Sequence, residues 1–144
     1  MPRDEPQPAT EHPQMTEMTA QDVLARYLEE ALPDFADLPS LDVNQRGRFE
    51  SCPLHIAATR GSAEEVQALL RGGADVRAVG DMGNLALHDA IDAGSLPAVQ
   101  LLLDAGSPLD VSNEFGQTPL ALGLASDDEA IRRLFEAQAA RAGG

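Results

Sequence analysis

Lysine and tryptophan are absent from the 144-residue sequence, and cysteine and tyrosine occur once each. With Cys52 as the single cysteine, no disulfide can form within the chain, and an oxidising compartment is not indicated. Only 3% of the residues are aromatic, so a core has to be built from leucine, alanine and valine. The hydrophobic share of 43% argues against a fully disordered chain, and the length allows one domain.

The sequence also lacks long apolar runs. None approaches the roughly 18 residues that a membrane helix needs, and the opening residues have no apolar segment of the kind found in signal peptides. We therefore expect a soluble, cytoplasmic protein. All ten basic residues are arginine, which is typical of a GC-rich genome and favours a bacterial source.

Acidic residues dominate, giving a net charge of −14, and they are unevenly placed. Residues 78–131 hold nine acids and no basic residue, whereas residues 43–77 hold four acids and five arginines. Such a chain repels phosphate backbones and anionic lipids, which disfavours nucleic-acid and membrane binding. It attracts basic protein surfaces. The competing interpretation is that the charge only maintains solubility.

The N-terminal part of the chain divides into two segments. Residues 1–18 contain four prolines among acidic and polar residues, which predicts a disordered acidic tail. Residues 19–40 predict a helix and a linker: Thr19 and Asp22 suit a helix start, and apolar residues follow at helical spacing until Pro33. Because a single helix of this length is marginal alone, we expect it to cap the segment that follows.

The rest of the chain, residues 41–142, repeats with a step of 33 residues. The motifs CPLH, LALH and TPLA begin at 52, 85 and 118. Leucine pairs at 69–70 and 102–103 keep the same step, and so do the glycines at 73 and 106. Several independent landmarks with one period predict a repeat architecture.

The segments PLHIAATRGSAEEVQALLRGGADV and ALHDAIDAGSLPAVQLLLDAGSPLDV resemble ankyrin repeats. The resemblance implies an all-α solenoid of helix-turn-helix repeats with β-turn fingers, an N-terminal capping helix and a polar C-terminal capping helix. It divides the chain into repeats at about 43–75, 76–108 and 109–140. It also implies that His55 and His88 brace neighbouring turns through hydrogen bonds.

Local signals support this division. Gly61 and Gly94 can supply a left-handed turn between the two helices of a repeat. Ser62 with Glu65 predicts a capping box at the second helix of the first repeat. Cys52 is a poor N-cap, and we expect it to be a small packing residue.

The third repeat departs from the other two. Asp127 stands where they have glycine, and Ile131, Leu134 and Phe135 are interpreted as arriving one residue early through a deletion in the connector. The rest of this segment is polar, as a terminal helix with no further repeat to cover it requires. These polar residues are Arg132, Arg133, Glu136, Gln138 and Arg141.

The sequence contains few residue patterns that indicate catalysis or metal binding. His88 and Asp92 lie one helical turn apart, but no third ligand stands at a supporting spacing, so neither a metal nor a cofactor is predicted. No glycine-rich phosphate loop occurs. We predict no catalytic residues and no enzyme activity.

The surface positions carry the functional prediction. Phe49, Met82 and Phe115 keep the 33-residue step, and the resemblance places them near the finger tips, unless each folds back over its own turn. Asp89 and Asp92 lie on one face of a first helix, which in this family lines the concave groove. The predicted partner-binding residues are Phe49, Asp81, Met82, Asp89, Asp92, Glu114, Phe115 and Asp127.

The sequence thus predicts a non-catalytic protein–protein interaction module that binds a basic partner through an acidic groove and finger tips. It leaves the oligomeric state open and favours a monomer. A small acidic ankyrin protein also resembles immunity proteins, which neutralise a toxin by tight binding. The first alternative is a structural or assembly subunit with an inert acidic surface. The second is an undetected enzyme or metal-binding protein.

Overall fold

A computed structural model describes residues 18–30, 32–33, 35–36, 38, 40–47 and 50–143. Residues 1–17 of the predicted tail lie outside these. Within the described part no strand occurs. The helices are α2 (Ala20–Glu29), α3 (Pro53–Thr59), α4 (Ala63–Arg71), α5 (Ala86–Ala93), α6 (Leu96–Asp104), α7 (Pro119–Leu124) and α8 (Glu129–Gly143), with a 3₁₀ turn η1 (Asp81–Gly83) before α5.

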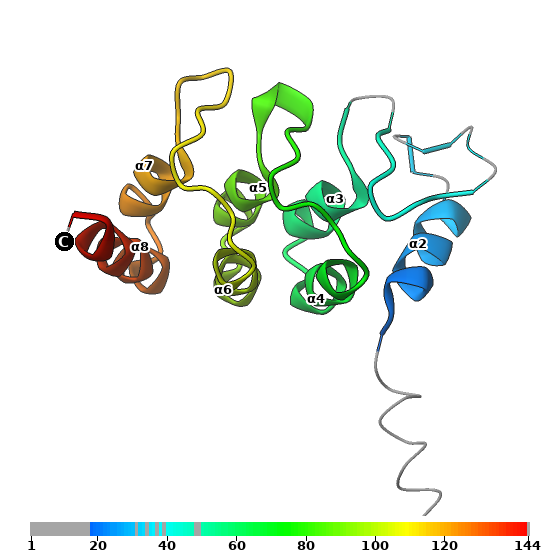
Figure 1. Cartoon of the computed structure of the whole chain (residues 1–144), viewed down its shortest axis with the longest axis horizontal. Coiled ribbons are helices and arrows are strands. Elements are labelled where there is room, and N and C mark those ends of the chain that lie inside the picture. The colour runs from blue at the N-terminus through cyan, green and yellow to red at the C-terminus, as the bar shows by residue number, and fades with distance from the viewer. Residues whose placement is uncertain are drawn as a thin grey trace, which may run out of the picture.

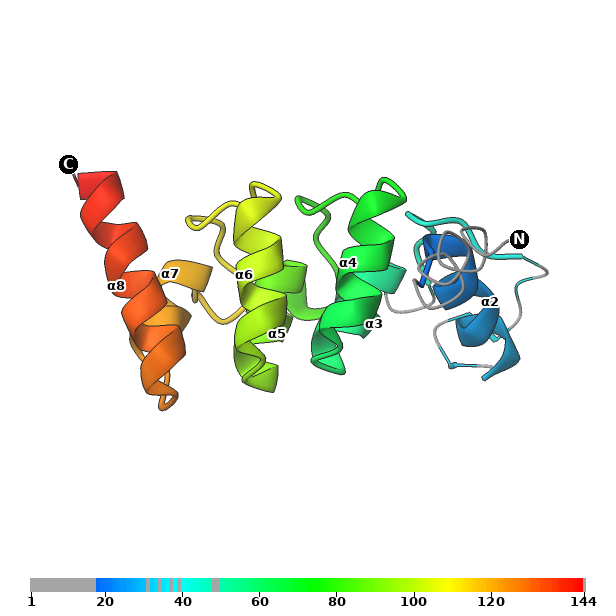
Figure 2. The ribbon, with the colours of Figure 1, turned by 90° about the horizontal axis from the view of Figure 1, so that it is seen from below.

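Three helical hairpins stand side by side with α2 at one end, and the loops before α3, α5 and α7 project to the same side (Figure 1). The outer helices α4, α6 and α8 form one layer, and the inner helices α3, α5 and α7 lie behind it (Figure 2). Inner helices contact inner helices of the next hairpin, and outer helices contact outer ones. The predicted all-α solenoid is therefore confirmed.

The second helix of each repeat begins at the same point of the 33-residue step. In each, an N-cap side chain accepts a hydrogen bond from the backbone N–H three residues on. These N-caps are Ser62 at 3.2 Å, Ser95 at 3.3 Å and Asp128 at 3.2 Å. The predicted deletion in the third connector is therefore wrong, because Asp128 keeps the step from Ser95 without any shift.

The predicted capping box at Ser62 forms only in part. Ser62 caps α4, but the Glu65 carboxylate turns away from it. It accepts hydrogen bonds from the Tyr27 hydroxyl at 2.6 Å and from the Arg26 guanidinium at 2.7 Å, both on α2. The Glu65 carboxylate therefore bonds two donors of a neighbouring helix, one of them the charged Arg26 guanidinium, in place of the single backbone N–H that a capping box offers.

Helix α2 begins where the sequence predicts, with Thr19 and Asp22 bonding each other's backbone N–H. It ends at Glu29, earlier than the expected stop at Pro33. Its buried side chains, Val23, Leu24 and Tyr27, join the core, and the helix packs against α4. The helix thus covers the first repeat, as a capping helix does.

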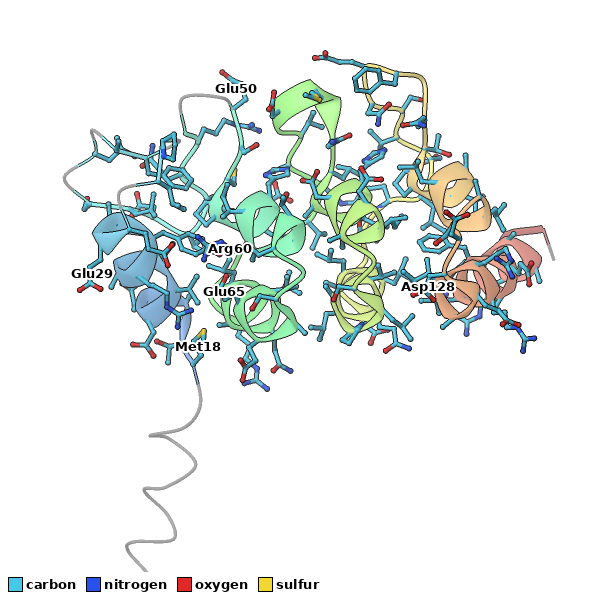
Figure 3. All side chains as sticks on the ribbon, turned by 180° about the vertical axis from the view of Figure 1, so that it is seen from behind. Met18, Glu29, Glu50, Arg60, Glu65 and Asp128 are labelled. Atoms are coloured by element: carbon cyan, nitrogen blue, oxygen red, sulfur yellow. The ribbon has the colours of Figure 1, made fainter. Side chains whose placement is uncertain are left out.

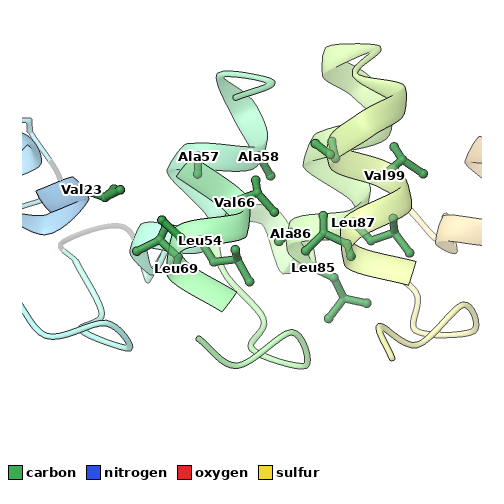
Figure 4. Close-up of a cluster of buried hydrophobic side chains, with 14 of the residues drawn as sticks. Val23, Leu54, Ala57, Ala58, Val66, Leu69, Leu85, Ala86, Leu87 and Val99 are labelled. Atoms are coloured by element: carbon green, nitrogen blue, oxygen red, sulfur yellow. The ribbon is translucent and has the colours of Figure 1, made fainter. Parts of the chain in front are cut away.

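A continuous, mainly aliphatic core runs through the stack. Figure 4 shows the part of it between Val23 of α2 and Val99 of α6. Val66 and Leu69 on α4 are fully buried, and so are Val99 and Leu102 on α6. No repeat can bury these faces alone, so each repeat depends on its neighbour for stability.

The C-terminal repeat closes the core in a different way. Phe135 is fully buried and stands one step after Leu102. The ring fits because α7 has a glycine opposite it: a Cβ built on Gly123 would lie 2.1 Å from Phe135. Arg132 stands one step after Val99, so a position that is fully buried in the two preceding repeats becomes polar where the stack ends.

Candidate protein-binding surface

The three loops before the inner helices are tight turns closed by the same backbone bond. In each, an N–H donates to the carbonyl oxygen four residues on. These pairs are Gly47–Ser51 at 2.8 Å, Gly80–Asn84 at 2.8 Å and Asn113–Gln117 at 2.9 Å, again one step apart. They are the predicted fingers. The second and third fingers present Met82 and Phe115, which are 50% and 67% exposed, whereas Phe49 lies outside the described residues.

The fingers are joined to one another. The Glu114 N–H donates to the Met82 carbonyl at 3.0 Å, and the Asn113 amide donates to the Asn84 side-chain oxygen at 2.9 Å. Arg46 of the first finger donates to the Val79 carbonyl at 2.6 Å. These links hold the exposed tips in fixed relative positions. Sequence reasoning missed the bridging side chains of Arg46, Asn84 and Asn113, because they stand at three different positions of the repeat and so give no periodic signal.

The first finger carries an unusual residue at its turn. Glu50 has a φ of 75°, and the residues one and two steps later, Gly83 and Gly116, have φ of 75° and 76°. This left-handed conformation suits glycine and strains a residue with a Cβ. Met82, beside Gly83, is left-handed as well, with a φ of 61°. Strained backbone therefore occurs at the finger tips.

Both histidines brace the fingers, as predicted. In His55, Nδ1 accepts from the Cys52 N–H at 2.9 Å, so Nε2 donates to the Ala78 carbonyl at 3.0 Å. His88 repeats this arrangement with Leu85 at 2.8 Å and Gln117 at 2.9 Å. Burial lowers the pKa of both imidazoles, which keeps them neutral and structural.

The predicted acids are distributed over two hollows and one finger. Asp81 and Asp89 line a hollow of about 290 Å³ between the second finger and α3. Asp92 and Asp127 line another of about 380 Å³ between α5 and the turn that leads from α7 to α8. Glu114 is exposed on the third finger. The acids are close enough to interact, because the charges of both Asp81 and Asp92 act on Asp89.

Asp89 differs from the other acids. It is half-buried, and its Oδ1 accepts a hydrogen bond from the Asn84 amide at 3.2 Å. Loss of solvation raises its pKa to about 7, the Asn84 bond opposes this rise, and the Asp92 and Asp81 charges add to it. Asp89 is therefore a carboxylate whose ionisation is costly in the free protein.

The ion pairs of Arg26, Arg60 and Arg133 do not involve the acids of the two hollows. Among the described residues, Arg26 and Arg60 form ion pairs with acids of the N-terminal part, and Arg133 pairs with Glu129 at 2.6 Å. Figure 3 shows Arg60 and Glu65 beside each other. Asp81, Asp89, Asp92 and Asp127 form no ion pair with another described residue. No arginine of the described part therefore competes with a partner for these carboxylates.

The described residues include no group of three or more His, Cys, Asp or Glu side chains that could hold a metal. Cys52 is buried, and burial raises the pKa of its thiol, so it packs as a neutral side chain. A further hollow of about 700 Å³ lies between the start of α2, residues 42–44 and the end of α4, and no residue of the second or third finger lines it.

The family model described as ankyrin repeats (3 copies) matches two overlapping ranges of the chain, residues 24–113 and 54–142. A comparison with curated proteins found no match. In the described part of the chain, no helix combines the length and the apolar character needed to span a bilayer.

Proposed function

Because this chain belongs to the ankyrin-repeat family, whose repeats generally mediate protein–protein interaction, we propose that it is a non-catalytic module that binds a protein with a basic surface. The contact surface consists of the tips of the second and third fingers and of the acids beneath them. We call this surface the acidic finger face. It comprises Asp81, Met82, Asp89, Asp92, Glu114, Phe115 and Asp127.

The observation that carries the proposal is the pair of exposed apolar tips on two fingers that hydrogen bonds hold together. Met82 and Phe115 are the kind of side chain that anchors an interface, and exposed apolar groups near each other are otherwise unfavourable. Because the fingers are fixed before binding, little conformational entropy is lost on association.

The acids supply the second element of recognition. Charges near the tips and in the hollows accelerate encounter with a basic surface and disfavour acidic competitors. An inert assembly subunit would need neither exposed apolar tips nor unpaired carboxylates in hollows. This is why we prefer the binding module to that alternative.

Charge reversal tests the proposal. Asp92→Arg with Asp127→Arg changes two exposed acids of the acidic finger face, and Asp104→Arg with Glu136→Arg makes the same net change on outer helices. We expect proteins captured from a lysate of the source organism to be lost with the first variant and kept with the second. High salt should release them. Equal capture by both variants would remove the acidic finger face from the mechanism.

A narrower form of the proposal is an inhibitor or immunity-type protein whose basic partner is a toxin or other effector. It predicts that the captured partner loses its own activity at a one-to-one ratio with this chain. A partner that stays fully active in the complex would exclude this form and leave the binding module intact.

A further inference from the structure

The three repeats differ at one position of the inner helices. Ile56 of α3 and Leu122 of α7 stand one step before and one step after Asp89 of α5. Both are partly buried and pack against the core, and Asp89 is half-buried at the same place. The fold therefore favours an aliphatic residue at this position. In the middle repeat the position holds a carboxylate instead, and a half-buried carboxylate stabilises the fold less than an aliphatic side chain does. Departures of this kind are expected where function requires them.

Asp89 faces the hollow between the second finger and α3. The hollow holds about 290 Å³, and its walls combine apolar and polar groups. Ile56 and Met82 offer aliphatic surface, Thr59 and Ser51 offer hydroxyls, and Asp81 lies at the finger. This combination suits a ligand with an aliphatic stem and a polar head.

No cation of the described residues neutralises Asp89. Its one hydrogen bond comes from the neutral Asn84 amide, and its neighbouring charges, Asp81 and Asp92, are negative. His55 also lines the hollow, but both of its ring nitrogens are engaged with backbone groups, and its pKa is lowered. A partly buried carboxylate without a counter-ion is unfavourable, and a cation from outside would relieve this.

We propose that this hollow is a socket for one basic side chain, arginine or lysine, of the protein partner. The stem would lie against Ile56 and Met82, and the cationic head would pair with Asp89. The inference rests on the proposed function, which it deepens by naming the group that the acidic finger face receives. Arginine has the planar head that can bond both oxygens of a carboxylate.

The socket can be tested without the natural partner. Small probes are Nα-acetyl-arginine-N-methylamide, its lysine analogue and, as an uncharged isostere, its citrulline analogue. NMR follows the titration of the ¹³C-labelled Asp89 carboxyl and the Ile56 methyl signals at constant ionic strength. We expect the arginine or lysine probe to lower the Asp89 midpoint by about one pH unit and to move the Ile56 signals. The citrulline probe should do neither.

Two variants provide the controls. Asp89→Leu restores the aliphatic residue of Leu122 and should keep the fold while abolishing the response of Ile56 to the charged probes. Asp104→Leu, on the outer helix α6, should leave that response unchanged. An unchanged Asp89 midpoint with both charged probes, or the same Ile56 shifts in Asp89→Leu, would overturn the socket.

Partner binding separates the socket from the wider proposal. Asp89→Leu should weaken binding of a captured partner by about tenfold, because an ion pair at the centre of the interface is lost. Unchanged affinity of Asp89→Leu, together with loss of capture by the Asp92/Asp127 reversal, would remove the socket and keep the proposed function. Unchanged capture by that reversal would instead contradict the proposed function itself.

Discussion

Helix α2 closes one end of the stack around a buried carboxylate, whereas α8 closes the other end by packing an aromatic ring against a glycine. Glu65 is 3% exposed and receives bonds from Tyr27 and Arg26, and Arg60 lies 4.9 Å from the centre of the Tyr27 ring. At the other end Phe135 is buried in the core and packs closely against Gly123. The same requirement, covering an exposed repeat, is thus met by polar pairing at one end and by close packing at the other.

The largest effect on stability should come from removing the Glu65 carboxylate, which joins α2 to the first repeat. Glu65→Ala leaves the Tyr27 hydroxyl buried without an acceptor and removes a partner from Arg26 and Arg60. We expect a loss of about 3–5 kcal/mol in the free energy of unfolding, as is typical of broken buried pairs. Hydrogen exchange should also show that α2 loses protection first. The neighbouring exposed residue provides the control, because Glu64→Ala should change stability by less than about 0.5 kcal/mol.

At the C-terminal end of the stack, stability should fall when a side chain is added at Gly123. Gly123→Ala improves helix propensity, yet the new Cβ would collide with Phe135, so we expect a net loss of about 1–3 kcal/mol by chemical denaturation. Combining it with Phe135→Leu, which restores the leucine of the preceding repeat, should recover stability relative to Gly123→Ala alone. Additive losses in the double variant would mean that the two residues are not matched in shape.

In the first finger we expect a smaller effect, a gain in stability on replacing Glu50. Glu50→Gly replaces a strained residue with the glycine that the other two fingers use, and we expect a gain of about 1 kcal/mol in thermal or chemical denaturation. Glu50→Ala keeps the Cβ and removes the charge, so it should give no such gain. Equal gains in both variants would assign the effect to charge instead of backbone strain.

The middle repeat should show a pH dependence in which two effects oppose each other. The raised pKa of Asp89 stabilises the fold at low pH, and this contribution is lost as the pH rises through about 7. The lowered pKa of His55 and of His88 acts in the other direction, because their contribution is lost as the pH falls below about 6.5. We therefore expect a small net change in wild-type stability between pH 5 and 8.

Removing Asp89 separates the two effects. Asp89→Leu should be more stable than wild type at pH 8, and this gain should shrink as the pH falls to 5. Unfolding curves at several pH values measure both proteins. A gain that is independent of pH would show that Asp89 does not titrate in this range.

Much of the fold was readable from the sequence because its landmarks recur at a fixed step. The motif with His55 and His88 predicted the bracing bonds, and the glycines predicted the left-handed turns at Gly61 and Gly94, where φ is 68° and 72°. The third repeat was misread because hydrophobicity was used to set its register. The N-cap Asp128 stands one step after the N-cap Ser95. Aligning the N-caps of the three repeats would have given the correct register.

Contacts between distant segments could not be predicted in this way. The sequence predicted a local role for Glu65 in a capping box, whereas its carboxylate bonds the hydroxyl of Tyr27, which lies 38 residues earlier in the chain. The hollows of the candidate site depend equally on how side chains of two repeats meet. The aliphatic neighbours of Asp89 in the repeat pattern were nevertheless visible, and they mark this residue as unusual without any coordinates.

The most direct measurement of the proposed function is the association rate of this chain with its purified partner at rising salt concentration. If the acidic finger face steers a basic surface, the rate should fall steeply as salt rises, and Asp92→Arg with Asp127→Arg should lower it most at low salt. A rate that is the same at low and high salt, and the same in wild type and in that variant, would contradict binding through this surface.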